Sequence, residues 1–215
     1  MRTGTPKVSR TALLAATWLA VFAMAGVGMV ALTHLYTQDQ TRENERNRLI
    51  RSVNEVLSDA RYDNDPVSDY LDLYDPELLP PKGETRVYRA FKAGKPVAAV
   101  FPITAPDGYN GAIHLLMAVN LDGSISGVRV LRHKETPGLG DEIERAKSHW
   151  ITHFTGKNLR QPNESGWKVK KDGGEFDQFT GAAITPRAVV MTVHRGIRLF
   201  HKHRRTLFPD TSPRS

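Results

Sequence analysis

The sequence predicts an α+β protein, in which a single N-terminal transmembrane helix precedes one domain with a mainly antiparallel sheet and flanking helices. Three observations support this fold class. An uncharged apolar run lies near the N-terminus, strand-like runs surround short turn signals in the middle of the chain, and a helical apolar stripe follows near the C-terminus. A chain of 215 residues is long enough for one ordinary domain and such a helix.

The composition excludes several kinds of cofactor and partner. The chain has no cysteine, which excludes disulfides, iron–sulfur clusters and thiol nucleophiles. The formal net charge of +7 lies at the two ends, because residues 1–38 carry +3 and residues 194–215 carry +5. The middle is almost neutral, whereas a nucleic-acid-binding domain places Lys and Arg across a folded face. We expect no nucleic-acid partner and no metal site.

The apolar run near the N-terminus is long enough to cross a membrane. Residues 11–33 carry no charge, and residues 12–32 are apolar apart from Thr17. At ~1.5 Å per residue this run makes a helix of about 31 Å, which matches a bilayer core of about 30 Å. We predict a transmembrane helix over residues 11–35, preceded by a basic segment over residues 1–10.

A cleaved signal peptide is the alternative interpretation of this run, since Ala23-Met24-Ala25 has the form of a cleavage site. Cleavage there would leave residues 26–35 as an exposed apolar N-terminus, so the uninterrupted run favours a retained helix. Basic residues flank the run on both sides, and the charge pattern therefore does not predict its orientation.

Residues 36–84 are predicted to form a connector of helix and loop. Within it, residues 39–61 show an apolar stripe at three- and four-residue steps, which indicates a helix. Residues 62–82 contain four prolines and are expected to form loops and turns.

The domain core is expected over residues 85–193. Strand-like runs on either side of Gly94-Lys95 and of Leu121-Asp122-Gly123 predict two hairpins, formed by residues 85–92 with 96–104 and by residues 112–120 with 124–133. A helix is predicted over residues 140–149, because its first turn is acidic, and a short strand over residues 168–170.

The last part of the chain, residues 194–215, is predicted to be a basic helix end and tail. His194, His201 and His203 lie among its basic side chains, which we expect to be solvated, with a partner-docking role as the alternative. We expect the aromatic side chains of Trp150, Phe154 and Trp167 to belong to the core.

The segment over residues 177–187 carries the strongest chemical signal. Thr185 followed by Pro186 has the form of a helix N-cap with proline at the first helical position. An apolar stripe at steps of four, four and three follows, formed by Val189, Val193, Ile197 and Phe200. A phosphate beside Thr185 would meet free backbone N–H groups and the positive end of the helix dipole. The alternative is that the Thr-Pro pair merely starts a helix.

This segment resembles the flavinylation motif of the FMN-binding domain family, in which an acid, two residues, Ser or Thr, Gly-Ala and a final Ser or Thr are spaced as here. The resemblance implies that FMN is bound covalently, as a phosphoester of Thr185, which would make the chain a phosphoprotein. It also places three further residues beside the cofactor, namely Thr180, Gly181 and Ala182. Family members usually have Thr where this chain has Ala183, so a hydroxyl that could aid flavinylation is missing.

A second segment is similar to the core of the same family, over residues 108–116 and 127–141. Its most distinctive part is Glu135-Thr136-Pro137-Gly138-Leu139-Gly140, a strand that leads into a rigid Pro-Gly turn. Such a turn exposes backbone N–H groups and small residues to a flat ring. The resemblance implies that Glu135, Thr136, Gly138 and Leu139 contribute to the FMN site.

The whole-length pattern of one span, one domain and one basic helix is similar to the G subunits of the Rnf/Rsx electron transport complex, and to the related C subunit of sodium-translocating NADH:quinone reductase. This resemblance implies a translocase subunit that relays electrons between NADH- and ferredoxin-linked cofactors. It implies the other complex subunits, a flavin transferase and membrane lipid as partners. It also implies a single-pass location in the bacterial inner membrane, with the basic segment over residues 1–10 in the cytoplasm and the domain on the periplasmic side.

We find no arrangement of side chains in the sequence that makes a complete substrate site. The chain is therefore expected to act as a subunit of an oxidoreductase, with the flavin supplying the chemistry. The alternative function is a membrane-anchored, non-redox binding or scaffold module that keeps the fold and carries no flavin.

Overall fold

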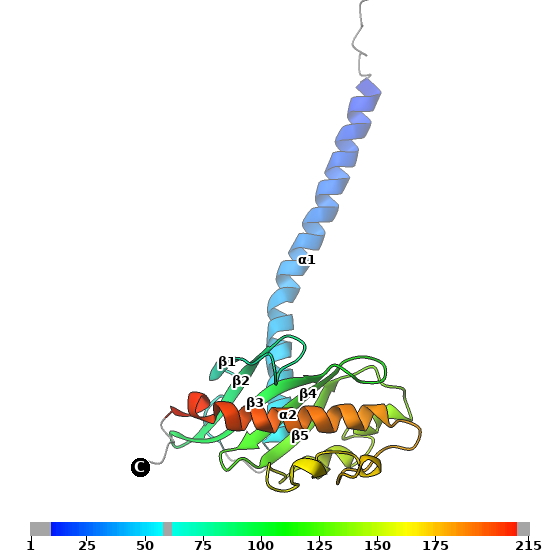
Figure 1. Cartoon of the computed structure of the whole chain (residues 1–215). Coiled ribbons are helices and arrows are strands. Elements are labelled where there is room, and N and C mark those ends of the chain that lie inside the picture. The colour runs from blue at the N-terminus through cyan, green and yellow to red at the C-terminus, as the bar shows by residue number, and fades with distance from the viewer. Residues whose placement is uncertain (1–9, 58–61, 210–215) are drawn as a thin grey trace, which may run out of the picture. The chain divides into compact units, whose positions relative to one another are not determined.

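The computed structural model describes residues 10–57 and 62–209 (Figure 1). The chain divides into two units, residues 1–47 and residues 48–215, and helix α1 (Arg10–Val56) includes the end of the first and the start of the second. Most of the predicted basic segment at the N-terminus and the last six residues of the predicted tail lie outside the described residues.

In the first unit, the N-terminal part of α1 is apolar on all sides. The part over Arg10–Leu32 has a mean hydropathy of 2.1 and is long and apolar enough to cross a membrane. Trp18, Leu19 and Phe22 are each at least 69% exposed. A helix without a polar face is typical of an apolar environment rather than of a water-facing surface.

The two helices predicted around residues 11–35 and 39–61 are one continuous helix, which ends at Val56. The intervening residues 36–38 include neither proline nor glycine, so nothing in the local sequence interrupts the helix. The predicted end at Arg61 lies outside the described residues.

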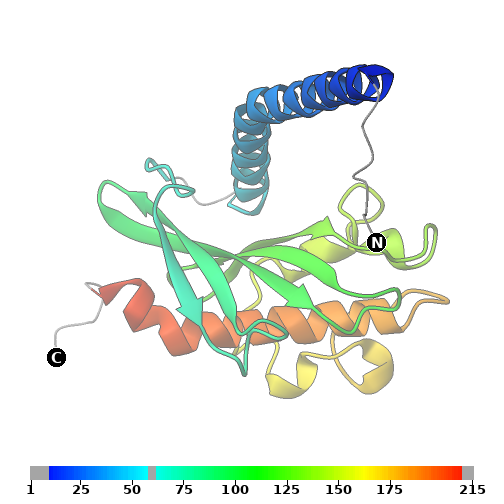
Figure 2. The ribbon, with the colours of Figure 1, turned by 90° about the horizontal axis from the view of Figure 1, so that it is seen from above.

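The second unit contains a five-stranded antiparallel sheet in which each strand pairs with the next one along the chain (Figures 1 and 2). The strands are β1 (Tyr70–Tyr74), β2 (Glu84–Lys92), β3 (Lys95–Ala105), β4 (Ile113–Asn120) and β5 (Ile125–Arg132). The predicted antiparallel sheet is therefore confirmed.

Both predicted hairpins are confirmed, as β2 with β3 and β4 with β5. The first hairpin turns at Ala93 and Gly94, one residue earlier than predicted, and both residues have positive φ angles, of 51° and 72°. Such angles at both central positions suit the right-handed twist of the strands that the turn connects.

Strand β1 lies in the segment that is predicted to be loop. Leu71 and Leu73 pack toward the core between exposed residues. A strand of five residues has only these two inward positions, and the apolar rings of its two exposed tyrosines hide the alternation in the sequence. Its pairing with β2 depends on tertiary contacts, including the ion pair between Arg86 and Asp72, whose atoms are 3.0 Å apart.

Helix α2 (Ile184–Leu207) runs along one face of the sheet (Figures 1 and 2). Its predicted apolar stripe is confirmed, because Val189, Val193, Ile197 and Phe200 are all fully buried. They belong to the same core as alternate residues of the two central strands, which include Phe101, Ile103, Leu115 and Met117. The opposite set of alternate residues, such as Val100 and Leu116, packs with Val53 and Val56 from the last turns of α1.

The chain between β5 and α2 contains short 3₁₀ helices, η1 (Gly140–Ile143), η2 (Trp150–Phe154), η3 (Glu164–Gly166) and η4 (Lys170–Asp172). An aromatic cluster holds this region together. Trp150, Phe154 and Trp167 are buried in it, as predicted, and Phe154 lies 4.7 Å from Phe176 between ring centroids.

Two predicted elements in this region are wrong. The helix expected over residues 140–149 is limited to η1, because Ile143 is its one buried apolar side chain and Glu144 has an extended backbone. An acidic first turn without an apolar stripe does not maintain a helix. Residues 168–170 do not form the expected strand either, since Val169 makes a single isolated bridge with Phe176 and Lys170 begins η4.

Candidate functional site

The start of α2 differs from the predicted cap in one respect. Ala183 occupies the N-cap position, and Thr185 is the second helical residue rather than the cap. Ala183 has near-helical angles, with φ of −75° and ψ of −23°, and its side chain makes no capping hydrogen bond. The N–H groups of the first turn are therefore not satisfied by the residue at the N-cap.

The side chain of Thr185 is fully buried and points toward the second family-like segment. Its hydroxyl group donates a hydrogen bond to Oε2 of Glu135, a side chain that is itself only 4% exposed. The structure thus brings together the two residues that the resemblance implies in separate parts of the sequence.

Further hydrogen bonds fix both the side chain and the backbone of Glu135. Its Oε1 accepts a hydrogen bond from the backbone N–H of Asn110 at 3.0 Å, and the Asn110 side chain donates to the Thr136 hydroxyl at 3.0 Å. The backbone N–H of Glu135 donates to Nδ1 of His133 at 3.0 Å. That bond leaves the ring proton of His133 on Nε2, which lies 2.7 Å from Oε1 of Glu144.

Two glycines allow Glu135 and Thr185 to approach each other. A Cβ atom on Gly140 would lie 2.8 Å from Cβ of Glu135 and 3.1 Å from the hydroxyl oxygen of Thr185. A Cβ atom on Gly108 would lie 3.0 Å from Oε1 of Glu135. Any side chain at Gly140 would push the glutamate and the threonine apart.

A cavity of about 440 Å³ opens beside this pair. Its lining residues are Tyr109, Glu135, Thr136, Leu139, Gly140, Gly181, Ala182, Ala183, Ile184 and Thr185. Six of the eight predicted site residues are among them. The other two are Gly138, which has a φ of 77° and donates its N–H to Asp141 at 2.7 Å, and Thr180, which is exposed.

Four residues that line the cavity are not among the predicted site residues, namely Tyr109, Gly140, Ala183 and Ile184. Tyr109 and Ile184 are 64% and 46% exposed, and with Leu139 they form an apolar rim. The signal for Tyr109 is its place next to glycine in the family-like segment. The local sequence around Ile184 indicates only the start of a helix.

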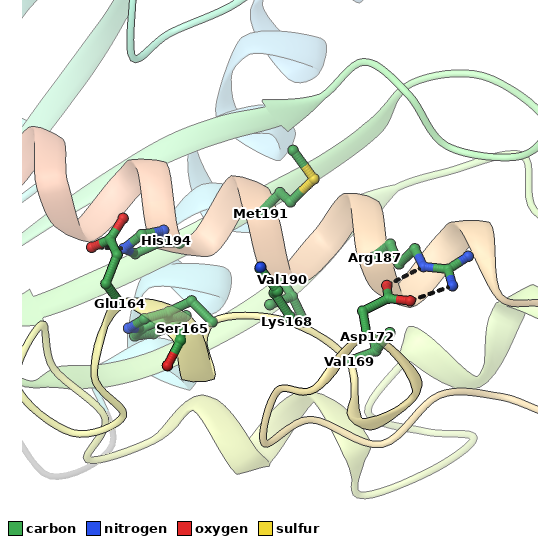
Figure 3. A pocket seen from close by; sticks show the side chains of 10 residues that line it. Glu164, Ser165, Lys168, Val169, Asp172, Arg187, Val190, Met191 and His194 are labelled. Atoms are coloured by element: carbon green, nitrogen blue, oxygen red, sulfur yellow. Dashed lines mark hydrogen bonds and ion pairs between the residues drawn. The ribbon is translucent and has the colours of Figure 1, made fainter.

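A second cavity, of about 750 Å³, lies along the first half of α2, and Figure 3 shows the side chains that line it. It includes His194, which stacks on Trp167 at 5.1 Å between ring centroids, and the ion pair between Arg187 and Asp172. Burial lowers the pKa of His194. This cavity shares no lining residue with the cavity at Thr185, and it contains none of the predicted site residues.

The prediction that the basic end of α2 is solvated holds only in part, because some side chains are exposed and two are paired. The exposed ones include Arg198, His201 and Arg205. Lys202 and His203 both contact Oδ2 of Asp75, each at 2.8 Å, and Asp75 is 3% exposed. Burial alone would raise the pKa of Asp75, but hydrogen bonds from Lys202, His203 and the Leu78 N–H outweigh it and lower this pKa to about 2. Over the part of the chain that the structure describes, His, Asp and Glu side chains form no cluster suited to a metal ion.

Comparison with known proteins agrees with this geometry. Residues 108–198 match the FMN-binding domain family, and residues 3–56 match the RnfG N-terminal region. The G subunit of the ion-translocating oxidoreductase complex from Pseudomonas aeruginosa strain UCBPP-PA14 is 46% identical over 202 residues, which cover 94% of each chain. The chain belongs to the family of G subunits of ion-translocating oxidoreductase complexes.

Two further members of this G-subunit family show the same extent of similarity. The protein from Cereibacter sphaeroides strain ATCC 17023 is 46% identical and covers 92% of this chain and 88% of its own. The protein from Vibrio cholerae strain O395 is 41% identical, and the match covers 91% of this chain and 93% of the relative. The match to the FMN-binding domain includes the segments of both Glu135 and Thr185, and the predicted family resemblance is confirmed.

Proposed function

We propose that this member of the G-subunit family is a membrane-anchored electron-transfer subunit of an ion-translocating oxidoreductase complex, with FMN attached as a phosphoester of Thr185. The observation that carries the proposal is the position of the Thr185 hydroxyl. It lies at a helix start without a capping side chain at the N-cap, beside a cavity lined by both family-like segments of an FMN-binding domain.

The residues around the cavity suit the three parts of FMN. The phosphate would lie at the first turn of α2, where the helix dipole and free N–H groups favour an anion. The small residues Gly181 and Ala182 leave room for the ribityl chain. The exposed apolar rim of Tyr109, Leu139 and Ile184 suits a flat ring. A cavity of about 440 Å³ lies within the range of cofactor sites.

When bound, FMN supplies one- and two-electron transfer, and the chain supplies its position. A covalent bond to Thr185 prevents the loss of the cofactor to the surrounding solvent. The exposed rim leaves the ring end of the cavity open toward a partner. In this role the domain relays electrons between NADH- and ferredoxin-linked cofactors on the other subunits of the complex.

The apolar part of α1 is the anchor in this proposal. It crosses the bacterial inner membrane once, and the second unit lies on the periplasmic side. Fusion of alkaline phosphatase to the C-terminus tests the orientation, because this enzyme is active only in the periplasm. We expect the alkaline phosphatase fusion to be active. The orientation would be contradicted if this fusion were inactive while a reporter that fluoresces only in the cytoplasm, fused at the same position, gave a signal.

Intact-mass analysis tests the covalent site. The full chain is expressed together with a flavin transferase, purified in detergent and denatured, so that only covalently bound flavin remains. We expect one added FMN-sized mass on the wild type and none on Thr185→Ala. Thr180→Ala is the matched control, because its hydroxyl belongs to the same motif but lies outside the cavity lining, and we expect it to retain the added mass.

Two outcomes would contradict the proposal. An added mass that persists in Thr185→Ala would place the flavin elsewhere. A wild-type chain that stays colourless after exposure to an active transferase would instead support a non-redox module with an FMN-binding fold.

A further inference from the structure

We propose that Glu135 is the general base for the covalent attachment of FMN, so that the acceptor chain itself activates the Thr185 hydroxyl. This inference rests on the proposed function and adds a catalytic role to a residue that the family resemblance assigns only to the FMN site. The geometry that points to it is the buried hydrogen bond in which Thr185 donates its proton to Glu135.

Glu135 differs from the other buried carboxyl groups in what it binds. Among the described residues, three acidic side chains are buried, namely Asp75, Asp141 and Glu135. Asp75 contacts Lys202 and His203, and Asp141 lies 3.5 Å from Nζ of Lys147. The ion pairs found in the described part of the chain include none with Glu135. A buried carboxylate without a cation is costly for stability and is a common feature of catalytic sites.

The hydrogen bonds of Glu135 have the direction that a base requires. Its Oε1 already accepts from the Asn110 N–H at 3.0 Å, which orients the carboxylate and leaves Oε2 for Thr185. An alcohol is a weak nucleophile at neutral pH, and it becomes reactive when a neighbouring base removes its proton. The proton that Thr185 has to lose is therefore already hydrogen-bonded to Oε2 of Glu135 before the reaction starts.

The pair of Glu135 and Thr185 also borders the cavity in which the phosphate would lie. Gly140 has no side chain that would separate the two residues, and both line the cavity at the start of α2. The positive end of the helix dipole stabilises negative charge that develops on a phosphoryl group there. Both a base and an electrostatic stabiliser thus belong to the acceptor chain.

The reaction balances with a flavin nucleotide whose FMN phosphate is part of a phosphoanhydride. Glu135 takes the proton of Thr185, and the hydroxyl oxygen of Thr185 forms a bond to the FMN phosphorus. The anhydride P–O bond breaks, and the second phosphate leaves with the electron pair. Because Glu135 becomes neutral as the bond forms, it does not oppose the new phosphodiester with a second negative charge.

The test measures the rate at which flavin becomes covalently attached, rather than electron transfer. Flavin-free full chain in detergent is mixed with the purified transferase, Mg²⁺ and FAD, and intact mass is followed over time. Glu135→Gln keeps an oxygen that accepts the Thr185 hydrogen bond but cannot take the proton. Glu142→Gln is the matched control, because this glutamate is exposed in the same region.

We expect Glu135→Gln to load about 10²- to 10⁴-fold more slowly than the wild type, the usual contribution of a general base. Glu142→Gln should load at the wild-type rate, and thermal unfolding should show that both variants are folded. If Glu135→Gln loads within about threefold of the wild type, well short of the usual contribution, the base role is wrong, while the proposed site at Thr185 stands.

A second variant separates a missing base from a disturbed fold. Glu135→Ala leaves space for a small carboxylate, so formate should accelerate its loading in a concentration-dependent way, whereas chloride should not. A lack of rescue by formate in a folded variant would overturn the proposal. A wild-type chain that does not load, or a Thr185→Ala chain that does, would instead overturn the proposed function.

Discussion

The hydroxyl group of Thr185 donates a hydrogen bond to the carboxylate of Glu135, although fifty residues separate the two in the chain. Glu135 follows the end of β5, and Thr185 lies in the first turn of α2. The packing of α2 against the sheet brings these two segments together, and Gly140 provides the space between them. The chemistry of the site therefore depends on how closely the helix start approaches the turn after β5.

Gly140→Ala should disturb this approach directly. The added methyl group would lie 2.8 Å from Cβ of Glu135, so the glutamate or the start of α2 has to move. We expect flavin loading of the full chain to fall by at least about tenfold, because a displacement of about 1 Å at a reacting group has effects of this size. Gly28→Ala is the control, since a Cβ atom at Gly28 would meet nothing within 4 Å. Equal loading of both variants would contradict this prediction.

Ala183→Thr tests the position at which the chain departs from the family motif. Ala183 lines the cavity, and its near-helical backbone prevents a threonine there from acting as a normal N-cap. A hydroxyl group at the cavity wall can contact the phosphate, so we expect flavin occupancy to rise or to stay the same. Ala183→Val has almost the same shape without the hydroxyl and should not raise occupancy. A clear fall in Ala183→Thr relative to Ala183→Val would show that the comparison with the family motif is wrong at this position.

The pairing of Asp75 with Lys202 and His203 should make the stability of the second unit depend on pH. The pKa of Asp75 is about 2 in the folded chain, whereas an unfolded aspartate has a pKa of about 3.9. Because the folded value is lower, the pairing stabilises fully above a pH of about 5 and is lost as the pH falls through about 4 toward about 2. The contribution to the free energy of unfolding is roughly 2–3 kcal/mol.

Urea unfolding of the full chain in detergent measures this effect against Asp75→Asn. The difference between wild type and variant should be close to its full value near neutral pH and should shrink as the pH approaches the folded pKa of about 2. Asp72→Asn is the control, because Asp72 is a largely exposed residue in β1, and its ion pair with Arg86 should contribute little. If the difference in the free energy of unfolding between wild type and Asp75→Asn were the same at low pH as near neutral pH, the role of Asp75 would be contradicted.

Two tryptophans in one aromatic cluster allow a matched comparison. The indole N–H of Trp150 donates to the carbonyl of Asp177 at 2.8 Å, at the start of the motif segment. The indole N–H of Trp167 is buried and has no hydrogen-bond partner among the residues that the structure describes. Substitution by phenylalanine removes a similar volume at both positions, but only Trp150→Phe also leaves a carbonyl unpaired.

We expect Trp150→Phe to reduce the free energy of unfolding by about 1 kcal/mol more than Trp167→Phe does. The comparison needs denaturant unfolding curves with the same slope for both variants, so that the difference reflects stability alone. An equal loss would show that the Trp150 hydrogen bond does not stabilise the start of the motif segment.

The elements that are predictable from the sequence are those with a strong local period. The continuous apolar run of α1, the two hairpins and the stripe of Val189, Val193 and Ile197 on α2 are all present. Elements without such a period are predicted poorly. Strand β1 has five residues, too few to show a clear period, and is missed, and the segment over residues 140–149 forms little more than a 3₁₀ turn.

The candidate site also has features that the local sequence predicts and features that it does not. The composition of residues 177–187 indicates a helix start with small residues, and its spacing resembles a known motif. The position of Thr185 inside the helix rather than at its cap depends on the backbone angles of Ala183, which residue types do not specify. Tyr109 belongs to the site only because its turn lies across the cavity from α2.

By itself, the sequence determined the anchor, the paired strands, the amphipathic helix and the family of this chain, because each depends on a pattern within a short segment. Only the tertiary structure decided that a buried glutamate, unpaired with any cation among the described residues, contacts the hydroxyl proposed to carry FMN. That contact depends on the packing of a helix against a sheet, on the absence of a side chain at Gly140 and on the burial of both partners. Interactions between distant segments have no local period, and they therefore leave no pattern in the sequence.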